Sequence, residues 1–444
     1  MAYKVGMVSL GCPKNQVDAE IMLADLKNDG FEITNDESKA DAIIVNTCGF
    51  IEDAKREAID NILEVAQLKK TGRLKALIVS GCLAQRYKDD MKKEMPEIDA
   101  IVTLGKNGDI CRIVRDAVRS NETRVYDAPL FCLPLGGERL LTTPKYMAYL
   151  KIAEGCDNRC TYCAIPMIRG QYRSRALEDI IDEAKALAKR GVKEITVVAQ
   201  DTTRYGEDIY GEGRLPQLLN ELCAIDGIEW IRVLYTYPER ITDELLDTVA
   251  NQPKVLNYLD IPIQHASDSV LARMNRRSNN AQLYALIKKI REKVPNITLR
   301  TTMIVGFPGE SDEDFTTLCE FVKAARFDRL GCFTYSPEEG TPAAEFPDQI
   351  PEDIKQRRYE VVMAEQSVIS EELTAQKIGT VAQVLVEGYD RLNKCYYGRS
   401  KSDAPDIDGK VFFQSAFSPS AGDIVSVKIT DSVEYDPIGE QIKE

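Results

Sequence analysis

Histidine is nearly absent from this chain of 444 residues, in which His265 is the only imidazole. One histidine removes most conventional acid and base mechanisms, so difficult chemistry would have to be carried by a cofactor. Long apolar runs are also missing: none approaches the roughly 18 residues that span a bilayer, and the first residues lack the apolar core of a signal peptide. We therefore expect a cytoplasmic protein with no membrane partner.

Positive charge is scarce as well. The chain has 57 lysines and arginines against 71 aspartates and glutamates, a formal net charge of −14, which argues against a protein built to coat nucleic acid. Its 12 cysteines, in a reducing compartment, are more often metal ligands or small buried hydrophobes than disulfides. The length is too great for one ordinary core and suggests about three domains.

Three cysteines lie within one short run, GCDNRCTYC, and we call Cys156, Cys160 and Cys163 the central triad. Three thiolates can hold three irons of a four-iron four-sulfur cluster and leave the fourth iron open to a ligand that is not protein. A zinc site would want a fourth cysteine or histidine at a familiar spacing, which is absent. The run therefore predicts an iron–sulfur cluster with an open site.

A second set of cysteines follows the predicted strands of the first region. Residues 1–132 alternate short β-rich runs with helical patterns, which indicates an open parallel α/β sheet. The carboxyl ends of parallel strands share one edge, so cysteines that follow different strands converge there. Strands predicted at 4–9, 41–47 and 75–80 are each followed by a member of what we call the N-terminal triad: Cys12, Cys48 and Cys82. This placement predicts a second cluster, and the other six cysteines fit buried packing better.

After a predicted linker at 133–144, residues 145–375 predict a partial (β/α)6 barrel of the TIM type, open on one side. Polar side chains follow its strands, where barrels place their active sites; among them are Gln200, Gln264 and the turn GFPGE, which contains Gly306 and Gly309. Six strands are predicted, at 147–153, 194–199, 230–235, 256–261, 297–304 and 329–334.

Each of three features of this region has two possible interpretations. His265 could be a hydrogen-bonded structural residue, and we assign it no catalysis. Arg276 could pair with a carboxylate through its planar fork, or it could end a solvated helix. The basic run at residues 169–175, IRGQYRSR in its context, could be surface solvation or could contact a ligand.

The last region, residues 376–444, predicts a small antiparallel β-barrel, with strands at 381–387, 411–414 and 424–430. It has eight lysines and arginines against eleven aspartates and glutamates. A net negative barrel is a poor phosphate binder, because nucleic-acid affinity comes largely from cationic side chains. We therefore expect no direct RNA binding by this barrel.

Taken together, the motifs SLGCPKN, NTCGF, SGCLAQRY, GCDNRCTYCAIP and GFPGE resemble those of the radical S-adenosylmethionine (SAM) methylthiotransferases, from end to end of the chain. The further motifs CPKNQVDAE, AQDTTRYG, YLDIPIQHAS and GRSKSDAPDIDG resemble the branch that methylthiolates the β-carbon of an aspartate in a small-subunit ribosomal protein at the decoding centre. Gln16 and Arg277 depart from the usual pattern, and neither is a predicted cluster ligand.

The resemblance implies an amino-terminal methylthiotransferase domain, a central radical SAM domain and a carboxyl-terminal TRAM barrel. It implies two four-iron four-sulfur clusters, one on each triad. One SAM molecule would methylate a sulfur on the auxiliary cluster, and another would give the radical that removes the substrate hydrogen. A flavodoxin or ferredoxin would supply electrons. The side chains and glycines expected to contact SAM are Tyr162, Gln200, Gln264, Arg276, Gly306 and Gly309.

Contact with the ribosomal partner is expected at Asp403, Asp406 and Asp408, with a solvated turn as the other interpretation. A transfer-RNA adenosine methylthiotransferase would share the three domains, but the negative barrel argues against it. An iron–sulfur electron carrier is the alternative of another class. A cluster with an open iron suits that role poorly, because relays prefer four protein ligands.

Overall fold

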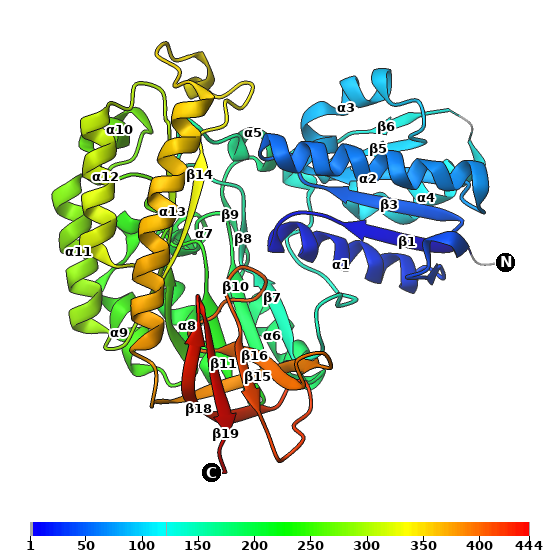
Figure 1. The fold of residues 1–444 in the computed structure, drawn as a ribbon. Coiled ribbons are helices and arrows are strands. Elements are labelled where there is room, and N and C mark those ends of the chain that lie inside the picture. Colours follow the sequence, from blue (N-terminus) through cyan, green and yellow to red (C-terminus); the bar gives the residue numbers. More distant parts are fainter. Residues whose placement is uncertain (1–2, 121, 444) are drawn as a thin grey trace.

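The computed structural model describes residues 3–120 and 122–443. Three units follow one another along the chain (Figure 1). An α/β unit, blue to cyan, lies beside a larger central unit, and a small barrel, orange to red, lies against the end of the central unit.

The amino-terminal unit is a six-stranded sheet in the order β2-β1-β3-β4-β5-β6, and every pairing is parallel. Helices α1 and α4 cover one face with an apolar cluster, and α2 and α3 cover the other. The strands are β1 (Lys4–Ser9), β2 (Glu32–Ile33), β3 (Ala42–Thr47), β4 (Ala76–Gly81), β5 (Ala100–Val102) and β6 (Arg124–Tyr126), and the helices are α1 (Pro13–Asn28), α2 (Glu52–Thr71), α3 (Cys82–Glu94) and α4 (Ile110–Arg119).

This sheet confirms the prediction of an open parallel α/β unit. The residues of β3 and β4 are all buried, which explains their continuous apolar sequence. Strands β2, β5 and β6 were not predicted, because runs of two or three residues are too short to show a pattern.

The central unit has a second six-stranded parallel sheet, in the order β14-β13-β12-β11-β10-β7. Its edge strands β7 and β14 do not pair with each other, so the partial barrel is open as predicted. The strands are β7 (Met147–Lys151), β10 (Glu194–Val198), β11 (Trp230–Val233), β12 (Val255–Asp260), β13 (Thr298–Val305) and β14 (Arg329–Thr334). A short antiparallel pair, β8 (Ala153–Glu154) with β9 (Arg173–Ser174), follows β7.

Helices pack outside this sheet, and the largest apolar cluster among the described residues fills the space between the two layers. The long α13 runs along β14 and leads into the barrel (Figure 1). The helices are α5 (Ile165–Arg169), α6 (Leu177–Lys189), α7 (Glu207–Tyr210), α8 (Leu215–Cys223), α9 (Asp243–Asn251), α10 (Asp268–Arg273), α11 (Asn280–Lys293), α12 (Asp312–Ala325) and α13 (Glu352–Ala375).

The last unit is a closed barrel in the order β15-β16-β17-β19-β18. Its pairings are antiparallel except that of β17 with β19, which is parallel. The strands are β15 (Val381–Asp390), β16 (Cys395–Ser400), β17 (Val411–Gln414), β18 (Ile424–Val433) and β19 (Asp436–Gln441). The small barrel is confirmed, but β16 and β19 were not predicted, since glycine, proline and charge dilute their β-propensity.

Residues 133–144 contain no helix or strand, as expected of a linker, yet they are firmly held. Arg139 is 5% exposed and pairs with Glu20 of α1 at 2.6 Å and with Glu183 of α6 at 2.7 Å. The domain boundaries at each side of this segment stay a prediction. Over residues 3–120 and 122–443, no helix combines the length and the apolar character that crossing a membrane requires.

Candidate active site

The central triad lies on the loop between β8 and α5. The Cys156 N–H donates to the carbonyl of Gly170 at 3.1 Å, and the Cys163 N–H donates to that of Cys160 at 3.1 Å. Burial raises the pKa of Cys156 to about 11, and burial and the Cys160 thiol raise that of Cys163. Buried thiols that raise each other's pKa need a positive partner to ionise, which iron supplies.

The N-terminal triad lies at the carboxyl edge of the first sheet. Cys12 precedes α1, Cys48 follows β3, and Cys82 begins α3. Burial raises the pKa of the Cys48 thiol and raises that of the Cys82 thiol to about 12. The nearby Cys12 thiol adds to the rise in both. The approach is close, because a Cβ added at Gly11 would lie 2.8 Å from the Cβ of Cys48. The predicted convergence of these loops is therefore present.

Both triads offer the thiolate donors that iron–sulfur clusters take. Among the residues that the structure describes, no group of three or more histidine, cysteine, aspartate or glutamate side chains is arranged to hold a single metal ion. Ligands of separate irons do not converge on one point, so this spacing is compatible with a cluster on each triad.

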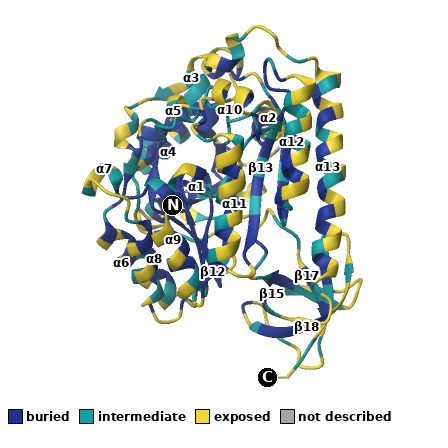
Figure 2. Cartoon of the chain, turned by 90° about the vertical axis from the view of Figure 1, so that its left-hand side faces the viewer, coloured by how far each residue is buried: buried dark blue, intermediate teal, exposed yellow. Residues whose placement is uncertain are grey.

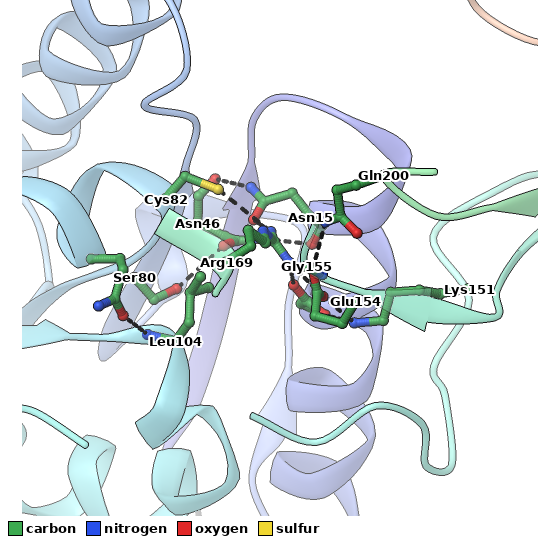
Figure 3. A network of polar contacts seen from close by, with 12 residues as sticks. Asn15, Asn46, Ser80, Cys82, Leu104, Lys151, Glu154, Gly155, Arg169 and Gln200 are labelled. Atoms are coloured by element: carbon green, nitrogen blue, oxygen red, sulfur yellow. Dashed lines mark hydrogen bonds and ion pairs between the residues drawn. The ribbon is translucent and has the colours of Figure 1, made fainter. Parts of the chain in front are cut away.

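A buried network of charges connects the two triads (Figure 3). Asp18 of α1 accepts from Arg169 at 2.7 Å and from Lys151, and Glu154 accepts from the same two cations at 2.8 and 3.0 Å. All four side chains are at most 1% exposed. Arg169 and its neighbours hold the pKa of Glu154 at about 2 against the effect of burial. Two cations thus balance two anions between the units.

The network reaches the loops of both triads. Arg169 donates to the Sγ of Cys82 at 3.5 Å, and Glu154 accepts from the N–H of Gly155, which precedes Cys156, at 3.1 Å. Of the residues predicted to contact SAM, Gln200 belongs here: its Nε2 donates to Glu154 at 2.5 Å, while its buried Oε1 has no partner in the described part of the chain.

Arg276 lies beside the central triad, with Nη1 3.9 Å from the Sγ of Cys160 and its guanidinium 4.0 Å from the ring centre of Tyr237. It is 8% exposed, so the alternative of a solvated helix end is wrong. Tyr162 is near the same thiol, which raises its pKa together with burial. Arg276 and Tyr162 therefore lie beside the thiols of the central triad.

A cavity of about 550 Å³ opens beside these groups, between the start of α2 and the carboxyl ends of the central strands. Tyr162 and Gln264, both predicted to contact SAM, line it, and the hydroxyl of Tyr335, which is 2% exposed, has no hydrogen-bond partner within residues 3–120 and 122–443. An unpaired polar group beside a cavity points to a ligand. The acidic and basic residues of the lining are Glu52, Asp53, Arg56, Glu338 and Glu352.

Gly306 and Gly309 do not line this cavity. Both have positive φ, +72° and +76°, and a Cβ there would lie 2.3 Å from Cγ of Lys355 and 1.5 Å from Nη1 of Arg273. The chain's own side chains therefore fill the space that the missing Cβ atoms leave, and the close approach expected of a ligand is made instead by these two cations.

His265, the single histidine, is fully buried. Its Nδ1 accepts from the Ser267 N–H at 3.0 Å, and its Nε2 lies 3.7 Å from the carboxylate of Glu310. Burial lowers its pKa to about 3. A neutral, hydrogen-bonded imidazole favours the structural interpretation.

The three aspartates expected to meet a protein partner each have a polar contact with the central unit. Asp403 binds Arg329 of β14 at 2.6 Å, Asp408 binds Arg300 of β13 at 2.8 Å, and Asp406 accepts from the hydroxyl of Tyr149 at 2.9 Å. The side chains of Asp403 and Asp408 are 2% and 1% exposed. The expectation of partner contact is corrected for Asp403 and Asp408, whose carboxylates hold the barrel on the central unit. Asp406 is exposed, and its contact with a partner stays a prediction.

The interpretation of the basic run as surface solvation is wrong for Arg169 and Arg175, which are 1% and 5% exposed. Sequence reasoning also missed Asn15, Asp18, Lys151 and Glu154 in the network. One available signal was the spacing of Asn15 and Asp18, which puts both on one face of a helix. Their partners lie more than 130 residues away, so the sequence could not pair them.

Three family descriptions match separate parts of the chain: the Radical SAM superfamily at residues 150–322, the uncharacterized protein family UPF0004 at 4–103 and the TRAM domain at 378–442. Among solved structures, the radical S-adenosylmethionine methyltransferase TsrM from Kitasatospora setae, with tryptophan substrate and a SAM analogue bound, has a TM-score of 0.56. It is 13% identical, with 88% of this chain and 79% of that chain covered, which shows a common fold alone.

Relatives of much higher identity match the whole chain. The ribosomal protein uS12 methylthiotransferase RimO of Geobacter sulfurreducens is 52% identical over 441 residues, 99% of this chain and 98% of that protein. The protein of the same name from Pelotomaculum thermopropionicum is 52% identical over 443 residues, 100% of both. The chain therefore belongs to the RimO family of radical SAM methylthiotransferases.

Proposed function

We propose that this enzyme adds a methylthio group to the β-carbon of an aspartate in ribosomal protein uS12. The observation that carries the proposal is the placement of the two cysteine triads. One buried network reaches the loops of both triads, and a cavity lined by Tyr162 lies beside the central triad. The relatives act, by their names, on uS12. A cofactor is needed because the β-carbon has no acidic proton for a side-chain base to remove.

The residues present fit the groups that this reaction requires. The central triad would hold the cluster that binds SAM, with Tyr162, Gln264 and Arg276 as SAM contacts, and the N-terminal triad would hold a second four-iron four-sulfur cluster. When bound, these groups supply the radical and the methylthio sulfur. We further propose a flavodoxin or ferredoxin as electron donor, and a cytoplasmic location beside the ribosome.

The cavity gives a reason for a protein substrate. Its lining has four carboxylates and the guanidinium of Arg56. Three of the carboxylates are paired with cations outside the lining: Glu52 with Lys55 at 2.9 Å, Glu338 with Arg86 at 2.8 Å and Glu352 with Lys355 at 2.9 Å. Ribosomal proteins are basic because they bind RNA phosphates, so residues that flank a target aspartate would be attracted to the exposed carboxylates of Glu52 and Asp53, which we call the acidic rim. The aromatic ring of Phe333, 51% exposed, adds an apolar contact surface to the same lining.

One experiment distinguishes a protein substrate from an RNA substrate. The reduced, reconstituted enzyme is incubated with SAM, a sulfide source and either purified uS12 or unmodified transfer RNA, and each product is weighed by mass spectrometry. We expect the methylthio mass gain on the protein alone. A gain on the RNA would place the chain with the transfer-RNA enzymes and show the charge argument to be wrong.

The acidic rim has its own test in the double variant Glu52→Gln, Asp53→Asn. We expect a KM for uS12 raised severalfold at low salt and less at high salt, because surface electrostatics are screened. The control is Glu57→Gln, Asp60→Asn on the same helix, which changes the same charge outside the cavity lining. Equal KM values for the two variants would remove the rim from substrate binding.

A further inference from the structure

Arg169 is a buried arginine that contacts the surroundings of both cysteine triads (Figure 3). It ends α5, the helix that follows the central triad in the chain. Its Nη2 donates to the Sγ of Cys82 at 3.5 Å, and its Nη1 donates to Glu154 at 2.8 Å. One planar group thus contacts a thiol of the N-terminal triad and a carboxylate two residues before Cys156.

The same guanidinium reaches the other two loops of the N-terminal triad through Asn15. Its Nη2 donates to Oδ1 of Asn15 at 3.1 Å. The amide of Asn15 in turn donates to the carbonyl of Leu10 at 2.7 Å and to that of Thr47 at 3.2 Å, just before Cys12 and Cys48. Arg169 and Asn15 together therefore fix all three loops of this triad relative to the central unit.

Charge balance makes this arrangement specific. Lys151 and Arg169 are the two cations, Asp18 and Glu154 are the two anions, and water reaches none of them. Buried ions must keep good geometry with their partners, and the planar fork of an arginine fixes direction as well as distance. A lysine could keep the charge, but it lacks two parallel donor edges.

We propose that Arg169 is a positioning residue that holds Cys82, and the cluster bound by its triad, at a fixed place relative to the central triad. Its N–H group directed at the sulfur also raises the reduction potential of that cluster, because hydrogen bonds to ligand sulfurs stabilise the more negative, reduced state. This inference rests on the proposed function, which assigns a second cluster to Cys12, Cys48 and Cys82.

The test uses the reconstituted full-length chain in two forms. In the Cys156→Ala, Cys160→Ala, Cys163→Ala background, the N-terminal triad alone keeps its thiols, and the electron paramagnetic resonance spectrum and midpoint potential of its cluster are measured. In the chain with all cysteines, the ratio of 5′-deoxyadenosine formed to methylthio groups transferred is measured. A misplaced cluster raises this ratio, because radicals then form without productive transfer.

The variant is Arg169→Gln combined with Asp18→Asn, which removes one cation and one anion and leaves the Lys151–Glu154 pair balanced. The matched control is Arg175→Gln combined with Glu183→Gln. It removes another buried pair, at 2.6 Å, and Arg139, the other partner of Glu183, keeps its pair with Glu20. Within the described residues, Arg175 has no hydrogen bond to a cysteine. Arg169→Lys, which keeps the charge and loses the fork, covers the case in which the first variant fails to fold.

We expect a lower midpoint potential, a changed spectrum and a severalfold higher ratio for the Arg169→Gln pair, and a raised ratio for Arg169→Lys. The control should match the parent protein. The inference would be overturned if the variant had the same midpoint potential, the same spectrum and the same product ratio as the control. A parent protein that binds iron for one cluster only would instead overturn the second cluster of the proposed function, and this inference with it.

Discussion

Glycines set the positions of cysteines in both triads. Gly81 precedes Cys82 with a φ of +93°, and a Cβ there would lie 2.4 Å from the carbonyl oxygen of Thr47. Gly155 precedes Cys156 with a φ of +79°, and its Cβ would lie 2.1 Å from the carbonyl oxygen of Gln171. Both contacts are with backbone, which cannot move aside as a flexible side chain can.

Alanine at each glycine should therefore remove one cluster and spare the other. We expect Gly81→Ala to lose the iron of the N-terminal triad and Gly155→Ala that of the central triad, measured as iron per chain after reconstitution. Gly191→Ala is the control: its φ is +91° but nothing lies within 4 Å, so we expect only about 1 kcal/mol of lost stability. A full complement of iron in Gly81→Ala would contradict the prediction.

The buried His265 gives a prediction about pH. Burial lowers its pKa from 6.5 to about 3, so the folded chain binds fewer protons than the unfolded chain between these values. Its contribution to stability is therefore complete above pH 6.5 and is lost as the pH falls toward 3. Between pH 6.5 and pH 5 the loss amounts to about 2 kcal/mol.

The test compares the wild type with His265→Gln, whose amide oxygen can still accept from Ser267. Denaturant unfolding at several pH values should show the wild type losing stability relative to the variant as the pH falls. Burial raises the pKa of neighbouring Glu310 to about 7, which gives a slope of opposite sign in both proteins, and the difference between them removes it. A difference that does not change with pH would contradict the prediction.

At this scale, the sequence predicted residues whose chemistry shows in local spacing. The grouping of six cysteines into two triads could be predicted because strand ends and short runs bring residues together by rule. Arg169 could not be placed, because an arginine is expected at the surface unless it is paired, and its partner Asp18 is 151 residues away. Asp403 was misread for the same reason, since its partner Arg329 lies in another unit.

At the scale of elements, the segment between the first two units acts as a fixed connection. Arg139 pairs with Glu20 of α1 and Glu183 of α6, so this irregular stretch joins both units through buried ions. Composition alone predicts a linker here but not its rigidity, because glycine and proline show only that regular structure ends. The strands were predictable where apolar runs were long, as in β3, and not where they were short, as in β5.

Arg139→Met should leave Glu20 and Glu183 buried without this cation. We expect a loss of about 3 kcal/mol in the free energy of unfolding, and faster proteolysis within residues 133–144. Arg190→Met is the control, because its side chain donates to the Arg139 carbonyl at 2.8 Å and its loss removes one hydrogen bond, worth about 1 kcal/mol. Equal losses in the two variants would show that the buried pairs are not what fixes the segment.

At the scale of the whole molecule, the barrel closes one end of the central sheet. Figure 2 shows buried residues continuing from the central strands toward the barrel strands. Three arginines of the central strands bind groups of the barrel region. Arg232 of β11 donates to the carbonyl of Lys401 at 3.0 Å, Arg300 of β13 pairs with Asp408, and Arg329 of β14 pairs with Asp403. The triads and the cavity lie at the opposite, carboxyl ends of the strands, so the barrel acts on the chemistry only through the sheet or by binding a partner.

This arrangement predicts that the barrel detaches when its buried carboxylates are neutralised. In Asp403→Asn, Asp408→Asn, the cations Arg329 and Arg300 lose their closest anions. Removing one partner of a buried pair costs about 3 kcal/mol or more, so we expect faster hydrogen exchange in both β14 and β15 and a lower unfolding midpoint.

The control for this variant lies at the rim of the same contact. Asp423 is 4.0 Å from Lys193 and half exposed, so Asp423→Asn should cost at most about 1 kcal/mol and leave exchange unchanged. If the double variant instead kept the exchange pattern of the wild type and lost only binding to uS12, the aspartates would be partner contacts after all. Their contacts with Arg329 and Arg300 would then have to open when the partner binds.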